Sequence, residues 1–234
     1  MKEYEYVHFI DSDAGSPLPA NATDTDTDDA TDAGPFSLWA YERVLREHRV
    51  IMGQPAVTNK AKTSAHPICR QEPHTLLRWT TFVENGPLFS VHVPSGGFAS
   101  VWEMVDPLSV SGYGVDLAFC PYLYELKGFD RSRTCAIVDA HPIDHLDTHS
   151  ATSQIFRTEG KEGQKLDYYT WGRIEWRRYA RLVGRGLQDW KRLDVLRRVP
   201  LEEGRGEGAR GRGGEGGSVE EGEKGEALVG VFGL

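Results

Sequence analysis

Apolar and polar positions along the chain predict short strands that alternate with helices. Residues 4–10 form a β-prone run that ends abruptly at Asp11-Ser12-Asp13, which predicts a buried strand followed by a turn with two carboxylates. In residues 37–48, apolar side chains recur at helical spacing and Ser37 stands at the N-cap position, which predicts an amphipathic helix.

The rest of the chain repeats this alternation. Further strands are expected at 50–52, 75–84, 87–93 and 134–139, and further helices at 98–105, 115–126, 166–183 and 187–198. Pro121 interrupts the helix at 115–126, and Gly53-Gln54-Pro55 is expected to close the strand at 50–52. This alternation predicts an α/β fold, a mixed sheet flanked by helices.

Two segments contain too few apolar residues for a core. Residues 14–35 combine Asp, Thr, Pro and Gly, which predicts a disordered acidic insertion. Residues 199–234 are mainly Gly, Glu and Arg, which predicts an unstructured low-complexity tail. The expected domain therefore consists of residues 1–13, with the strand and its acidic turn, and residues 36–198.

The net charge of the chain is confined to its first 35 residues and leaves the expected fold unchanged. The 234 residues carry a formal net charge of −8, and residues 1–35, with nine acids and one Lys, account for all of it. No run approaches the length of a membrane span, and the first residues lack the apolar core of a signal peptide. Three Cys are too few and too scattered for a disulfide scaffold or a four-Cys zinc site.

Asp11 and Asp13 are the first candidates for chemistry. Two carboxylates two positions apart on a turn can face one Mg²⁺ or Mn²⁺ ion, since these ions take oxygen ligands. A solvated turn, or an Asp that caps a turn, explains the same three residues without a ligand.

Two further segments present acids or imidazoles near turns. Asp116 follows the Gly-rich turn 112–114 and suits a general base, or an acid that meets the dipole at a helix start. His141, His145 and His149 stand four apart and could bind zinc from one helical face, although Pro142 argues against a regular helix. A single imidazole after a strand is the simpler interpretation.

The basic stretch 157–198 interleaves Arg with Trp and Tyr, a composition that can bind RNA. Its aromatic and aliphatic residues recur at near-helical spacing, so an apolar stripe with Arg on the solvent face is the preferred interpretation. The acidic tail beyond it weakens a phosphate-binding role.

The order of these pieces resembles a eukaryotic family catalogued as domain of unknown function 707, which looks like a glycosyltransferase of the GT-A type. The resemblance covers about residues 4–195. It is carried by YEYVHFIDSDAG (4–15), YERVLREHRVIMGQP (41–55), FVENGPLFS (82–90), Val101-Trp102, Gly112 to Asp116, Ala136 to Ala140 with His145, and the Trp and Tyr residues of the C-terminal helices.

The resemblance implies a site for a nucleotide-sugar donor and a carbohydrate or glycoconjugate acceptor, and no nucleic-acid partner. Asp13 would bind Mn²⁺ or Mg²⁺ directly, Asp11 would contact the ribose or the ion, and His145 would complete the protein ligands. The ion would neutralise the leaving diphosphate. Asp116 would take the acceptor's proton, and Glu84 is a second candidate for that role. Trp79, Phe89 and Tyr113 could stack on a sugar or belong to the core.

The chain departs from the family pattern at its start. The family has further βα units before the D-x-D strand, and many relatives carry a membrane anchor, so this chain is expected to be N-terminally truncated. A Golgi or secretory location follows from the resemblance alone. A non-catalytic or truncated relative that acts as a binding module is the alternative, followed by an RNA-associated protein that uses residues 157–213.

Overall fold

A computed structural model of the chain describes residues 4–10, 14–15, 36–58, 66–105, 114–145, 163–183, 193–201 and 228–231. Its strands are β1 (Tyr6–Ile10), β2 (Ala14–Gly15), β3 (Met52–Val57), β4 (Thr75–Thr80), β5 (Leu88–His92), β6 (Cys135–His145), β7 (Val195–Pro200) and β8 (Leu228–Val231). Its helices are α1 (Leu38–His48), η1 (Pro67–Cys69), α2 (Gly97–Met104), α3 (Val115–Pro121), η2 (Tyr122–Leu126) and α5 (Gly163–Leu182).

The strands form one mixed sheet in the order β7-β4-β6-β3-β5-β1-β8, and β2 pairs with β6 off this path. β3 and β6 are parallel, and β5 is antiparallel to both β3 and β1. Strands β1, β3 and β6 therefore run in the same direction, and their carboxyl ends lie at one edge of the sheet. The predicted α/β class is confirmed.

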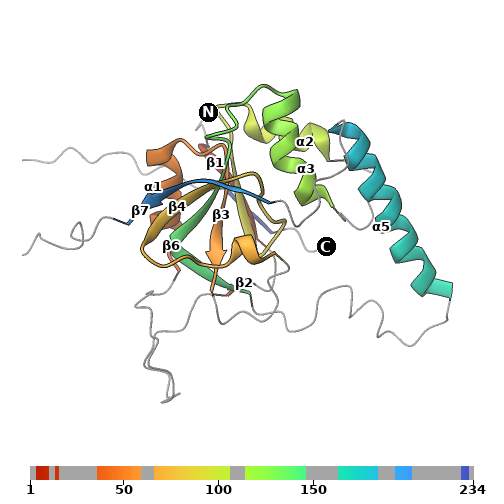
Figure 1. Cartoon of the computed structure of the whole chain (residues 1–234), viewed down its shortest axis with the longest axis horizontal. Helices are drawn as coiled ribbons and strands as arrows, with labels where there is room; N and C mark the ends of the chain where they lie inside the picture. The colour runs from red at the N-terminus through yellow and green to blue at the C-terminus, as the bar shows by residue number, and fades with distance from the viewer. Residues whose placement is uncertain are drawn as a thin grey trace, which may run out of the picture.

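Helices cover both faces of this sheet (Figure 1), with α1 on one face and α2, α3 and α5 on the other. The alternation of side chains along β6 supplies both cores, since Cys135 and Ile137 face the α3 side and Ala136 and Val138 face the α1 side. The sheet is therefore buried in a three-layer arrangement, which explains the nearly continuous apolar runs of its central strands.

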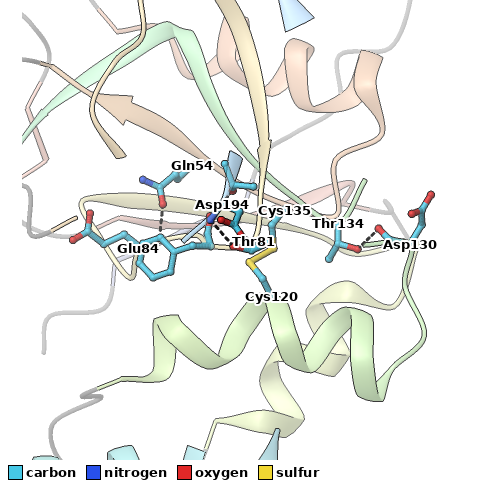
Figure 2. The surroundings of a disulfide bond; sticks show 10 residues. Gln54, Thr81, Glu84, Cys120, Asp130, Thr134, Cys135 and Asp194 are labelled. Atoms are coloured by element: carbon cyan, nitrogen blue, oxygen red, sulfur yellow. Dashed lines mark hydrogen bonds between the residues drawn. A yellow bond between two sulfur atoms is a disulfide. The ribbon is translucent and has the colours of Figure 1, made fainter. Parts of the chain in front are cut away.

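A disulfide joins α3 to the sheet (Figure 2). Cys120 near the end of α3 is bonded to Cys135, the first residue of β6, across a Cα–Cα distance of 6.1 Å. Cys69 remains a free, buried thiol. The disulfide fixes the end of α3 against the amino end of β6.

Several expected elements have different bounds. The strand expected at 50–52 continues through Gly53-Gln54-Pro55 to Val57, and its pairing with β6 shifts register after Pro55, which has no N–H to donate. Gly53 lies within the strand because α1 packs closely there: a Cβ would lie 2.5 Å from Leu45 Cδ2.

Other segments expected to be helical or disordered form strands. Residues 195–200 are β7, which pairs with β4, and not the end of a helix at 187–198. β6 extends to His145, so the helical zinc face of three histidines is wrong for His141 and His145, while His149 lies outside the described residues. Ala14–Gly15 pairs with β6, and Leu228–Val231 pairs with β1 inside the expected tail.

Candidate functional site

His145 and Ala14, the residue that follows Asp13, meet at the carboxyl edge of the sheet. β2 pairs with the end of β6 so that Ala14 lies opposite His145 and Gly15 opposite Asp144. Opposite Cα atoms in an antiparallel pair are about 4.5–5.5 Å apart. Asp11 and Asp13 lie outside the described residues, but Asp13 is covalently joined to Ala14.

Neighbouring side chains hold this corner in place. The Thr58 hydroxyl, just beyond β3, donates a hydrogen bond to Asp144 Oδ1, and the Thr58 N–H donates to the Ile143 carbonyl at 3.0 Å. These two hydrogen bonds tie the end of β3 to the end of β6 and occupy one oxygen of Asp144. Within the described ranges, no three His, Cys, Asp or Glu side chains gather closely enough to hold a metal ion.

Asp116 stands at the start of α3 on the helical side of the sheet. Gly114 makes the turn into the helix with a φ of 83°, which favours glycine, and the Leu117 N–H donates to Asp116 Oδ1 at 2.8 Å. His66 Nε2 lies 3.8 Å from Asp116 Oδ2. Burial raises the pKa of Asp116 to about 6 and lowers the pKa of His66. Near neutral pH, a charged carboxylate therefore faces an uncharged imidazole.

Glu84 joins the same cluster through Cys69. Burial raises the pKa of the Cys69 thiol, and the nearby Glu84 carboxylate and then Asp116 raise it further, so the sulfur stays protonated and is a poor nucleophile. The Gln54 amide oxygen accepts a hydrogen bond from the Glu84 N–H (Figure 2). Both predicted catalytic acids, Glu84 and Asp116, thus raise the pKa of one buried thiol.

A buried ion pair positions the segment that carries His66 and Cys69. Arg78 of β4 binds Asp139 of β6 through Nε and Nη2, at 2.8 and 2.9 Å. The same guanidinium donates to the carbonyls of Ile68 and Arg70 at 2.8 and 2.6 Å. The role of Arg78 was not predicted from the sequence, where its signal is a cation within a largely apolar strand.

The aromatic residues considered for sugar stacking belong to the core where they are described. Trp79 and Phe89 are 1% and 6% exposed, and Tyr113 lies outside the described residues. On α5, Arg173, Arg177 and Arg181 are exposed while Tyr179 is buried, as in the amphipathic helix preferred over an RNA-binding stretch. The expected apolar stripe is incomplete, however, because Ile174 and Leu182 are exposed.

No family model, curated protein or solved structure matches this chain. Among the helices of the described ranges, none has the length and apolar character needed to cross a bilayer.

Proposed function

We propose that this protein is a divalent-metal-dependent glycosyltransferase of the GT-A type, which transfers a sugar from a nucleotide-sugar donor to a carbohydrate or glycoconjugate acceptor. The observation that carries the proposal is the pairing of Ala14 with His145, because it joins the exit of the D-x-D turn to an imidazole. This pairing lies at the carboxyl ends of parallel strands, where open α/β sheets bind their ligands.

The available donor groups fit a hard divalent cation. Asp11 and Asp13 would offer carboxylate oxygens and His145 a ring nitrogen, a set that suits Mn²⁺ or Mg²⁺. When bound, the ion would supply charge neutralisation for a diphosphate leaving group. The protein's part would be to hold Ala14, the residue after Asp13, opposite His145 through the β2–β6 pairing.

Asp116 is the proposed general base. Its pKa of about 6 lies nearer to neutral pH than that of an ordinary Asp, which makes its carboxylate a stronger proton acceptor that is still ionised at pH 7. The Leu117 N–H fixes one oxygen, and the other faces the His66 imidazole. Glu84, held by Gln54, is the second candidate for the same role.

Calorimetry with Mn²⁺ and a nucleoside diphosphate tests the metal site. We expect Mn²⁺-dependent nucleotide binding by the full chain, and a loss of at least tenfold in affinity for Asp13→Ala and for His145→Ala. Glu103→Gln, at an exposed position of α2, is the control and should bind as the unmodified chain does. Binding that is indifferent to Asp13→Ala, or independent of Mn²⁺, contradicts the proposal.

A further inference from the structure

We propose that a hollow at the amino edge of the sheet binds a phosphate group. The hollow has a volume of about 320 Å³ and is lined by Glu47, His48, Arg49, Trp79, Arg133 and Arg197. These residues come from the end of α1, from β4, from the turn before β6 and from β7. We call this set the arginine hollow.

Three guanidinium groups line the arginine hollow, and none of them is within ion-pair distance of a described carboxylate. In the part of the chain that the structure describes, Arg49, Arg133 and Arg197 form no ion pair and no side-chain hydrogen bond. Arg78 and Arg198, by contrast, bind carboxylates at 2.8 and 2.6 Å. The carboxyl end of α1 can stabilise one nearby cation, but it does not account for three.

The Trp79 indole, which lines the hollow, carries a neutral donor without a partner in the described ranges. The Trp79 side chain is 1% exposed, and its Nε1–H has no hydrogen-bond partner among the described residues. Arg197 lies over the same indole ring, 5.6 Å from its centroid. A buried donor without a partner is destabilising, so an acceptor oxygen bound in the hollow would satisfy the indole and the guanidiniums together.

The charges near the arginine hollow match a dianion. Burial lowers the pKa of His48. The Glu47 carboxylate raises this pKa and Arg197 lowers it, and the net shift is downward, so the imidazole is uncharged near pH 7. Two carboxylates lie near these arginines. Glu47 Oε1 is 4.0 Å from Arg43 Nε, and the pKa of Asp130 is lowered by hydrogen bonds from Ser132 and by the charges of Arg133 and Arg197. The three arginines of the hollow and Arg43, against Glu47 and Asp130, leave two positive charges, and a phosphomonoester carries about −1.5 to −2.

The arginine hollow is remote from the proposed catalytic corner. Trp79 pairs with Ala136 near the start of β6, whereas His145 ends that strand. Their partners on β3, Gly53 opposite Ala136 and Val57 opposite Ile143, are four residues apart, and two more residues lead from Ile143 to His145, so the two places lie about 20 Å apart along the sheet. The inference is therefore independent of the proposed glycosyltransferase activity, and either can fail alone.

Inorganic phosphate is the first probe. We expect saturable binding by calorimetry, a shift of one indole N–H resonance in ¹⁵N NMR spectra, and affinity that falls as salt is added. Arg133→Ala and Arg197→Ala should each weaken binding about tenfold or more, because each removes a charge-assisted hydrogen bond. Arg131→Ala is the matched control, since this guanidinium from the same turn lies over the Tyr124 ring, 5.3 Å from its centroid.

A second arm identifies the source of the phosphate. Vesicles that contain a phosphoinositide should compete with inorganic phosphate if a lipid headgroup is the natural ligand, and vesicles of neutral lipid should not. Tight vesicle binding that Arg133→Ala removes assigns a lipid headgroup, while phosphate binding without vesicle binding assigns a small phosphorylated molecule. Absence of saturable phosphate binding at millimolar concentration, or binding that survives both arginine variants, overturns the proposal. Circular dichroism confirms that each variant is folded.

Discussion

The Arg78 guanidinium and the Asp139 carboxylate form a two-point ion pair inside the fold, with 2% and 0% of their side chains exposed. The pair joins β4 to β6. Through the Ile68 and Arg70 carbonyls it also fixes the segment that carries His66 and Cys69. The geometry around Asp116 therefore depends on a buried charge pair that does not belong to the site itself.

We expect Arg78→Ala to destabilise the protein by about 3–5 kcal/mol, because Asp139 would stay buried without a cation. Arg78→Lys should also be destabilising, since an ammonium cannot reproduce the fork that reaches both carboxylate oxygens and two carbonyls. Urea denaturation measures both. Arg198→Ala is the control: this exposed arginine binds Glu72 at the surface, and its loss should cost less than about 1 kcal/mol. An equal decrease in the free energy of unfolding for Arg78→Ala and Arg198→Ala would contradict this account.

The Cys120–Cys135 disulfide closes a loop with a sequence separation of 15. Replacing both cysteines by Ala should lower the free energy of unfolding by about 3 kcal/mol, since the unfolded chain regains loop entropy. Thermal unfolding with and without dithiothreitol measures the effect. The double variant should be insensitive to the reductant, which serves as the control. Titration of three free thiols in the non-reduced, denatured protein would show that the bond is absent.

Asp116→Asn should alter how stability depends on pH. The pKa of Asp116 is about 6 in the folded chain against 3.8 ordinarily, so its contribution to stability is full below about pH 4 and is lost as pH rises through 6. This loss is about 3 kcal/mol, and Asn does not titrate. Urea denaturation at pH 4 and pH 7.5 should therefore show Asp116→Asn gaining stability relative to the unmodified protein at the higher pH.

Asp130→Asn provides the control. Hydrogen bonds from Ser132 lower the pKa of Asp130, so its contribution to stability is present above about pH 4 and is lost only at lower pH, and the free energies of unfolding of this variant and the unmodified protein should differ by a nearly constant amount between pH 4 and 7.5. If the free energies of unfolding of Asp116→Asn and the unmodified protein differ by the same amount at pH 4 and pH 7.5, the pKa of Asp116 is not raised in the folded protein.

His8 is held in the core by two polar contacts. Its Nδ1 lies 2.7 Å from Ser90 Oγ, and its Nε2 lies 3.3 Å from Glu42 Oε2. Ser90→Ala should cost about 1–3 kcal/mol because it leaves a buried ring nitrogen without a partner. Ser132→Ala, at an exposed turn, should change stability by less than about 0.5 kcal/mol. Chemical denaturation compares the two variants, and similar small effects would mean that the His8–Ser90 contact contributes little.

Local patterns in the sequence identified most of the secondary structure. The periodicity of residues 37–48 and the Ser37 cap predicted α1 almost to the residue, because a capped amphipathic helix is a local structure. The strands β1, β4 and β5 were also expected, with longer bounds than they have. Errors arose where pairing overrides local preference. β3 runs through Pro55 because β6 lies beside it, and β7 replaces a helix because β4 lies beside it.

The sequence by itself determined the α/β class, the positions of the main helices and strands, and the acidic residues that carry the functional proposal, since each depends on spacing within a few neighbouring positions. Tertiary structure alone decided that Ala14 pairs with His145, that Glu84 and Asp116 both act on the pKa of Cys69, and that Arg49, Arg133 and Arg197 line one hollow. These contacts join residues far apart in the chain, and their partners are selected by strand order and by the burial of two sheet faces, which no local pattern encodes.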